Sequence, residues 1–226
     1  MRGHGNSARV LVVEGHADKR LIQGLRRHSG ITEQFDVRYP GEDGRHPGKS
    51  GAMKRFTTLL DEAVEPGRFE AIGLFVDADF PQNGKPANDG FVGTAQALND
   101  CLARAGFRQT NAIQRTFIHP VSGCRASFWI SPSHGADGHV ETMLVNALVP
   151  SERTYLDSVV RPFLNGLSDQ HRRFDERNRD RAELYVYLGL QRKPDKSVPT
   201  LFDDGLADAH ATSLSPLTAW MQHLFS

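Results

Sequence analysis

The feature that most constrains the fold is a regular alternation of two apolar patterns in the first half of the chain. Short apolar runs, typical of strands buried on both faces, predict strands at residues 9–13, 35–40 and 71–76. Apolar residues that recur at helical spacing predict helices at about residues 17–28, 52–63 and 91–105. This strand–helix order predicts a parallel sheet with helices on both faces and right-handed crossovers. The expected fold class is therefore α/β.

The second half of the chain has a less regular pattern. Residues 116–118 and 126–130 predict two more strands, which we expect to pair at or near an edge of the sheet. Gly138 precedes a short helical stripe, and the pattern after Pro150 is mainly helical up to the last residues. We therefore expect an α/β core over residues 8–150 and a helical C-terminal extension, residues 151–226, packed on this core.

Charge and cysteine content limit the classes of protein. Lys+Arg 27 balances Asp+Glu 27, which argues against a surface coated with positive charge but allows a local basic groove. The two cysteines, Cys101 and Cys124, lie far apart and indicate a reduced, cytoplasmic setting. No apolar run is long enough to span a bilayer, and the N-terminal residues lack the apolar core of a signal peptide. We expect a cytoplasmic protein without a membrane partner.

Acidic side chains follow two of the predicted strands. Glu14 comes directly after the first strand, and Asp77 and Asp79 follow the third. Ligands of open parallel sheets bind beyond the carboxyl ends of the strands, and residues two apart in an extended chain point to the same side. Three converging carboxylates need a cation to neutralise them, and such oxygen ligands suit Mg²⁺ or Mn²⁺. The sequence therefore predicts a metal site of the kind that handles phosphate esters.

The start of the first helix adds an expected phosphate site. Gly15 allows a sharp turn after Glu14, and the free N–H groups of the helix N-terminus favour an anion. Asp18, in the first turn, is expected to be either an N-terminal cap or a further metal ligand. We expect Gly15, Lys19, Lys49 and Lys85 to contact the phosphate.

The segments VVEGHADKRLI and GLFVDADF resemble the TOPRIM domain of topoisomerases, primases and nucleases of the OLD type. The resemblance rests on a Glu after the first strand and a DxD after the third. It implies a Rossmann-like sheet in which these two strands are neighbours. It also implies that Asp77 and Asp79 bind Mg²⁺ and that Glu14 shares the metal or acts as general acid/base. In OLD-type nucleases an acid four residues beyond the Glu extends the motif, which matches Asp18.

A later segment, FWISPSHGADGHVETMLVNAL, resembles a bacterial TOPRIM-related group in which a strand ending near a Pro is followed by Gly-x-x-Glu. The matching positions are Trp129, Pro132, Gly138 and Glu141. Nucleases of this type also place a basic residue near the phosphate. The candidates for this residue are Lys19, Arg20, Lys85, Arg181 and Lys193.

The predicted function is Mg²⁺-dependent phosphodiester chemistry on DNA or RNA, most simply that of a nuclease. Glu14, Asp77 and Asp79 are the expected catalytic residues, and Asp18 and Glu141 could complete a second metal position. One alternative is a non-catalytic module that binds metal and a phosphate-bearing ligand, and an ATPase or other protein is a possible partner. A second alternative is a small-molecule phosphatase, because DADF and LFDDG, residues 201–205, resemble the acidic motifs of haloacid dehalogenases. The sequence does not define the oligomeric state.

Two other patterns are disfavoured. The stretch GRHPGKSG, residues 44–51, resembles a P-loop but has Asp43 where the first Gly is required. His134, His139 and Glu141 lie close in sequence, but not with the H-E-x-x-H spacing of zinc peptidases. His139 and Glu141 are two apart and are expected to point in different directions at the start of a helix. Glu141 is then expected to cap the helix, to form an ion pair or to add an acid near the Mg²⁺.

Overall fold

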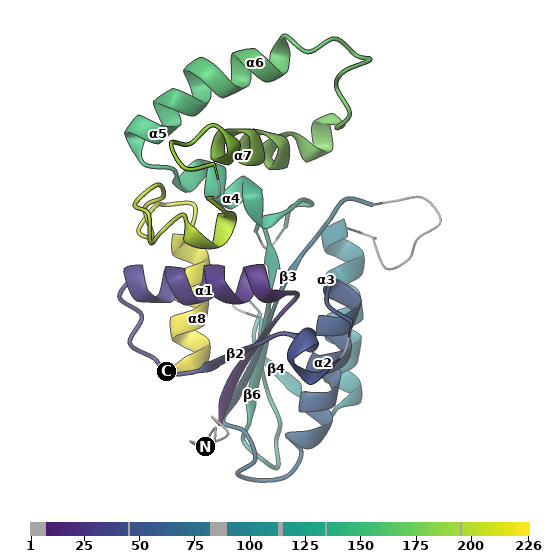
Figure 1. Ribbon diagram of the computed structural model, residues 1–226. Coiled ribbons are helices and arrows are strands. Elements are labelled where there is room, and N and C mark those ends of the chain that lie inside the picture. Colours follow the sequence, from purple (N-terminus) through teal and green to yellow (C-terminus); the bar gives the residue numbers. More distant parts are fainter. Residues whose placement is uncertain (1–7, 45, 82–89, 113–114, 134, 195) are drawn as a thin grey trace.

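The computed structural model describes residues 8–44, 46–81, 90–112, 115–133, 135–194 and 196–226. Its centre is a six-stranded sheet in the order β2-β1-β3-β6-β5-β4 (Figure 1). The strands are β1 (Arg9–Val13), β2 (Asp36–Arg38), β3 (Ala71–Asp77), β4 (Arg108–Asn111), β5 (Thr116–Ile118) and β6 (Arg125–Ser131). The first, second, third and sixth pair in parallel, whereas β4 and β5 are antiparallel. The predicted α/β class with a largely parallel sheet is confirmed.

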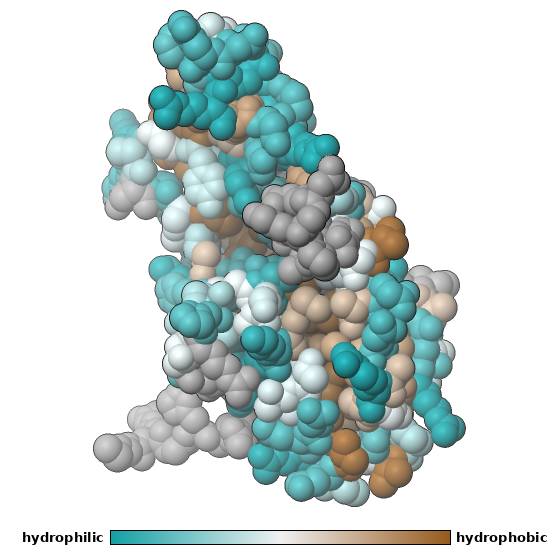
Figure 2. Space-filling view, turned by 90° about the vertical axis from the view of Figure 1, so that its right-hand side faces the viewer, coloured by the Kyte–Doolittle hydropathy of each residue, from teal (hydrophilic) through white to brown (hydrophobic). Residues whose placement is uncertain are grey.

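Helices cover both faces of the sheet, as predicted. Helices α1 (His16–His28) and α8 (Ser215–Phe225) lie on one face, and α2 (Lys49–Glu62) and α3 (Gly90–Arg104) lie on the other (Figure 1). Because side chains alternate along a strand, Leu11 of β1 packs with the first pair of helices and Val12 with the second. The surface over α2 and α3 is mixed, with small hydrophobic areas among hydrophilic ones (Figure 2).

The helix α8 belongs to the C-terminal part of the chain, yet it packs directly on β3 and β6. Gly73 of β3 permits this approach, because a Cβ at this position would lie 3.0 Å from Leu224 and 3.2 Å from Phe225. The indole N–H of Trp220 also donates to Ser127 Oγ of β6 at 2.7 Å. The last helix therefore completes a layer of the α/β core.

The other C-terminal helices stand beyond the carboxyl ends of the strands, at the top of Figure 1. They are α4 (Val140–Ala147), α5 (Pro150–Tyr155), α6 (Arg161–Asn165) and α7 (Arg179–Gly189), with a π turn at Leu156–Val160 and short 3₁₀ turns at Glu176–Asn178 and Val198–Thr200. The buried Glu183 of α7 accepts hydrogen bonds from Arg161 and Arg179, at 3.0 Å and 2.8 Å. This pairing joins α7 to the rod formed by α5, the π turn and α6.

Several boundaries differ from the predictions. A 3₁₀ turn, Pro40–Asp43, follows β2 where no helical turn was predicted, and α2 begins at Lys49 instead of Ala52. The strand β4 was not predicted, because its four residues RQTN are polar and largely exposed. Residues 82–89, between the predicted strand at 71–76 and the predicted helix at 91–105, lie outside the described residues. Among the described residues, no helix is both long and apolar enough to cross a lipid bilayer.

Candidate metal centre

The loop after β3 brings two distant segments together. Asp77 is the last residue of β3, and Asp79 follows in a left-handed conformation with φ 59°. The backbone N–H of Asp79 donates to Gly138 O at 2.8 Å, and Gly138 N donates back to Asp79 O at 3.0 Å. Aspartate is among the residues that tolerate this conformation best. The backbone pairing fixes the DxD loop beside the residue that follows Gly138, which is His139.

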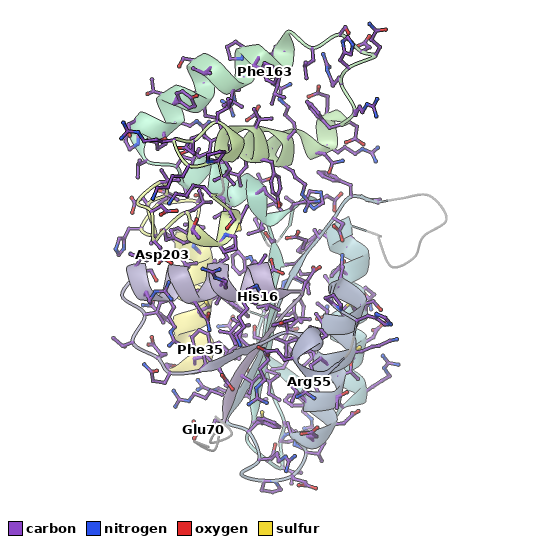
Figure 3. All side chains as sticks on the ribbon, in the orientation of Figure 1. His16, Phe35, Arg55, Glu70, Phe163 and Asp203 are labelled. Carbon is purple, nitrogen blue, oxygen red and sulfur yellow. The ribbon has the colours of Figure 1, made fainter. Side chains whose placement is uncertain are left out.

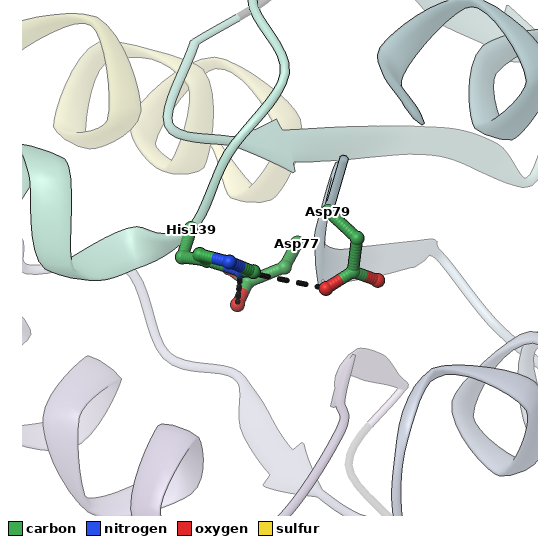
Figure 4. Close-up of side chains that lie close together, drawn as sticks. All are labelled: Asp77, Asp79 and His139. Carbon is green, nitrogen blue, oxygen red and sulfur yellow. Dashed lines mark ion pairs between the residues drawn. The ribbon is translucent and has the colours of Figure 1, made fainter. Parts of the chain in front are cut away.

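His139 points between the two aspartates (Figure 4). Its Nδ1 lies 3.6 Å from Asp77 Oδ2 and 3.4 Å from Asp79 Oδ1, while its side chain is only 9% exposed. Among the described residues, Asp77, Asp79 and His139 form a group whose potential ligand atoms all lie within 4.8 Å of one another. Two carboxylates and one imidazole at this separation can surround a divalent cation.

Each member of this group is held by a further contact. Asp77 Oδ1 accepts a hydrogen bond from the backbone N–H of Val140 at 2.9 Å, at the start of α4. Asp79 Oδ2 faces Lys49 Nζ at 3.2 Å, and the same ammonium donates to Ala78 O at 2.8 Å. His139 Nε2 lies 3.2 Å from Asn178 Oδ1. Such outer contacts orient metal ligands and tune their basicity.

Glu14 lies beside the group, at the end of the neighbouring strand β1. Its Oε1 accepts a hydrogen bond from the backbone N–H of Asp77 at 2.9 Å. Burial and the nearby Asp77 carboxylate raise the pKa of Glu14 to about 8. Glu14 can therefore exchange a proton near neutral pH.

Asp18 caps the start of α1, which is one of its two predicted roles. Its Oδ2 accepts a hydrogen bond from the backbone N–H of Gly15 at 2.9 Å. Burial, followed by the charge of Asp77, raises the pKa of Asp18 to about 6. The Gly15 N–H, which we expected to face a phosphate, is directed to this carboxylate.

Glu141 forms an ion pair, one of the roles left open for it. It is buried in the first turn of α4 and accepts two hydrogen bonds from Arg181, at 3.1 Å and 3.3 Å. Arg181 Nη2 also lies 3.6 Å from Asp77 Oδ2. The helical C-terminal part thereby places the positive charge of Arg181 at the edge of the sheet that carries the acids.

The charges in the group shift one another. Burial raises the pKa of Asp77, and the charge of His139 only partly opposes this effect. Burial would also raise the pKa of Asp79, but His139 and Lys49 outweigh it and lower the pKa. Burial disfavours the protonated form of His139, but Asp77 and Asp79 outweigh it and raise its pKa to about 9. In the absence of a cation, a proton on His139 therefore places a positive charge within 3.6 Å of both carboxylates.

A cavity of about 250 Å³ opens beside this group. It is lined by Asp79, Phe80 and His139 from the core and by Asp175, Arg177, Asn178 and Arg181 from the helical C-terminal part. Two arginines, two aspartates and the imidazole of His139 thus line the same cavity. Such a combination of charges suits a phosphate-bearing ligand held next to a cation.

The remaining predicted positions are distributed as follows. Lys49 lies at the centre, whereas Lys19 forms an ion pair with Glu42 at 2.5 Å. Lys85 and His134 lie outside the described residues. Asp203 and Asp204, the late acidic pair of the phosphatase alternative, pair with Arg27 and with Lys196 near the far end of α1 (Figure 3).

Two functional candidates, His139 and Asn178, were missed as members of the centre. The sequence pattern groups His139 only with His134 and Glu141, as a disfavoured zinc site, and Asn178 lies in a charged stretch without a motif. The one available signal was a histidine directly before a predicted helix, next to a glycine that resembled a family position. That signal could not show which strand end His139 would reach.

The sheet and the centre together define a mixed α/β protein with a candidate metal centre of two aspartates and a histidine at the carboxyl edge of its parallel strands. The chain belongs to the family described as a protein of unknown function (DUF3226), whose model matches residues 8–226. No curated protein and no solved structure matches the chain.

Proposed function

We propose that the chain is a divalent-metal-dependent phosphodiesterase that acts on nucleic acid, most simply a nuclease with a TOPRIM-like core. The observation that carries the proposal is the convergence of Glu14, Asp77 and Asp79 at adjoining ends of β1 and β3. The order and spacing of these acids are those of the TOPRIM resemblance, and they lie where open parallel sheets bind ligands.

The donor set fits a divalent cation. Asp77 and Asp79 each direct an oxygen toward His139, whose buried Nδ1 has no hydrogen-bond partner within the described part of the chain. Asp77, Asp79 and His139 would hold Mg²⁺ or Mn²⁺, with Glu14 beside them. The cation would polarise the phosphate and stabilise the leaving oxygen. Asp18 and Glu141 already bind Gly15 N–H and Arg181, which favours a single cation.

The surrounding residues supply the other requirements of phosphodiester cleavage. Glu14, with a pKa raised to about 8, is suited to accept or release a proton close to neutral pH. Lys49 and Arg181 provide positive charge on two sides of the acids, where a phosphate would enter. Charge-assisted hydrogen bonds from such groups orient phosphates strongly.

The test is a cleavage assay on single- and double-stranded DNA and RNA with Mg²⁺ or Mn²⁺. The double variant Asp77→Asn/Asp79→Asn removes both charges, and Asp203→Asn/Asp204→Asn is its matched control far from the centre. We expect cleavage by the wild type and the control, and none by the first variant. Equal cleavage by all three proteins would show that the activity arises elsewhere.

The assay also separates the two alternatives. A regulatory module would bind the cation and a phosphate-bearing ligand without turnover, alone or with an ATPase partner. A phosphatase would release phosphate from small monoesters, would leave DNA and RNA intact, and would depend on Asp203 and Asp204. These outcomes differ from cleavage that depends on Asp77 and Asp79.

A further inference from the structure

We propose that His139 is a direct ligand of the cation through Nδ1, and that this nitrogen makes the centre select a first-row transition dication such as Mn²⁺ over Mg²⁺. The inference rests on the metal centre of the proposed function and specifies its chemistry. It departs from the all-oxygen ligand set that the sequence predicted.

The first argument is the environment of Nδ1. This atom faces two carboxylates, and more than nine-tenths of its side chain is buried. Even so, it has no hydrogen-bond partner among the residues that the structure describes. Its distances of 3.4 Å and 3.6 Å to the carboxylate oxygens exceed those of ordinary N–H···O hydrogen bonds. Ligands at right angles around a cation about 2.1 Å away lie roughly 3 Å apart, so the observed separation is close to that of atoms that share a cation.

The second argument is the tautomer of His139. The amide nitrogen of Asn178 donates to Asp175 Oδ1 at 2.7 Å, which leaves Asn178 Oδ1 to face His139 Nε2 at 3.2 Å. A carbonyl oxygen only accepts, so Nε2 must carry the hydrogen. The lone pair of a neutral imidazole is then on Nδ1, directed at Asp77 and Asp79. Histidines that bind metals characteristically donate their other N–H in this way.

The third argument is the orientation of the carboxylates. Each aspartate uses one oxygen for a hydrogen bond, Asp77 with the N–H of Val140 and Asp79 with Lys49. The other oxygen of each faces Nδ1, and that of Asp77 also lies 3.6 Å from Arg181 Nη2. Two oxygens and one nitrogen are therefore directed at a common point by groups outside the cluster, which is how metal sites are preorganised.

Selectivity follows from the nitrogen. Mg²⁺ prefers oxygen ligands and keeps much of its water, whereas imidazole suits first-row transition metals. The two carboxylates keep the centre compatible with Mn²⁺, a cation that accepts oxygen and nitrogen donors alike. His139 should therefore contribute more to the binding of Mn²⁺ than to that of Mg²⁺.

The experiment measures metal binding by the full chain without nucleic acid. Calorimetry gives the affinities for Mn²⁺ and Mg²⁺, and pulsed electron paramagnetic resonance of the Mn²⁺ complex detects a directly bound nitrogen. We expect nitrogen coupling in the wild type and its loss in His139→Asn. The variant should lose about 10- to 100-fold in Mn²⁺ affinity, the range typical of a disturbed ligand shell, and markedly less in Mg²⁺ affinity.

The control is His119→Asn, because His119 is as buried as His139 but lies at the opposite end of β6. There it shares a hydrogen bond with the hydroxyl of Ser122. It should keep both affinities and the nitrogen coupling. Mn²⁺ binding without nitrogen coupling in the wild type would overturn this inference alone, even if His139→Asn fails to fold. An equal loss of both affinities in a folded His139→Asn would do the same. Failure of the wild type to bind any dication would overturn the proposed function as well.

Discussion

The side chain of Glu14 accepts a hydrogen bond from the backbone N–H of Asp77, with 2.9 Å between Glu14 Oε1 and that nitrogen. The bond joins the ends of β1 and β3, two adjacent parallel strands. The bond itself favours the ionised carboxylate, but burial and the charge of Asp77 outweigh it and raise the pKa of Glu14 to about 8. In the cation-free chain, Glu14 therefore stays largely protonated at neutral pH.

The first prediction concerns the pH dependence of stability. The pKa of Glu14 rises on folding from 4.5 to about 8, so the folded state binds this proton more tightly. Its contribution to the free energy of unfolding is full below pH 4.5 and is lost as the pH rises through 8. Replacing Glu14 with Gln keeps an acceptor for Asp77 N–H and removes the titration. In the presence of a chelator, the melting temperature of Glu14→Gln should fall less than that of the wild type across this range.

The comparison needs a surface carboxylate as its control. Glu70 is 60% exposed and pairs with Arg9, so Glu70→Gln should reproduce the wild-type slope of melting temperature against pH. His139 also stabilises the folded state, and this contribution is lost as the pH rises through 9. Because His139 is present in all three proteins, it does not affect the comparison. Identical slopes in Glu14→Gln and the wild type would contradict the raised pKa.

The sequence predicted the parts of the fold that depend on local pattern. The strands β1, β3 and β6 are apolar runs buried on both faces, and the acids at the ends of β1 and β3 lie where a parallel sheet brings them to one edge. The strand β4 was not predicted, because an edge strand with exposed side chains needs no alternation of apolar and polar residues. Pattern alone therefore indicates the buried centre of a sheet better than its rim.

The candidate centre could be predicted only in part for a related reason. Glu14, Asp77 and Asp79 each end a recognisable strand, so topology alone brings them together. His139 joins them through the backbone pairing of Asp79 with Gly138, two loops whose contact has no local sequence pattern. Asn178 reaches His139 from the helical C-terminal part by a tertiary contact of the same kind.

The second prediction tests the close packing of α8 on the sheet. In Gly73→Ala the new methyl group would lie 2.9 Å from Leu11 and 3.0 Å from Leu224. Overpacking of this kind should lower the free energy of unfolding by about 1–3 kcal/mol in urea denaturation. Gly189→Ala in α7 is the matched control, since no atom of a packed neighbour among the described residues lies within 4 Å of its Cβ position, and it should not lower stability. A tolerated Gly73→Ala would mean that α8 can withdraw from β3 without cost.

The third prediction concerns stabilisation by the cation. A ligand that binds only the folded chain adds about 2.7 kcal/mol at a hundredfold excess over its Kd. Mn²⁺ should therefore raise the melting temperature of the wild type, and the shift should disappear in Asp77→Asn/Asp79→Asn. The variant Asp203→Asn/Asp204→Asn should keep the shift. A shift that persists in the first variant would place the bound cation at another site.

The fourth prediction separates the cation from the phosphate. The Lys49 side chain is 10% exposed, and its ammonium lies 3.2 Å from Asp79 Oδ2, so it repels a cation at the centre and attracts a phosphate. Replacing it with Met should strengthen Mn²⁺ binding and weaken the binding of inorganic phosphate to the Mn²⁺ complex, each by about 1 kcal/mol. Calorimetric titrations measure both affinities.

The control for this experiment is Lys54→Met, an exposed lysine on the same helix, which should change neither affinity. The opposite signs are the decisive feature, because a general loosening of the fold would weaken both ligands. Lys49 also donates to Ala78 O at 2.8 Å, and its loss removes one support of the DxD loop. If Lys49→Met weakens the binding of Mn²⁺ and of phosphate alike, Lys49 serves to hold this loop in place. The phosphate must then be bound by Arg177 and Arg181, the two arginines that line the cavity.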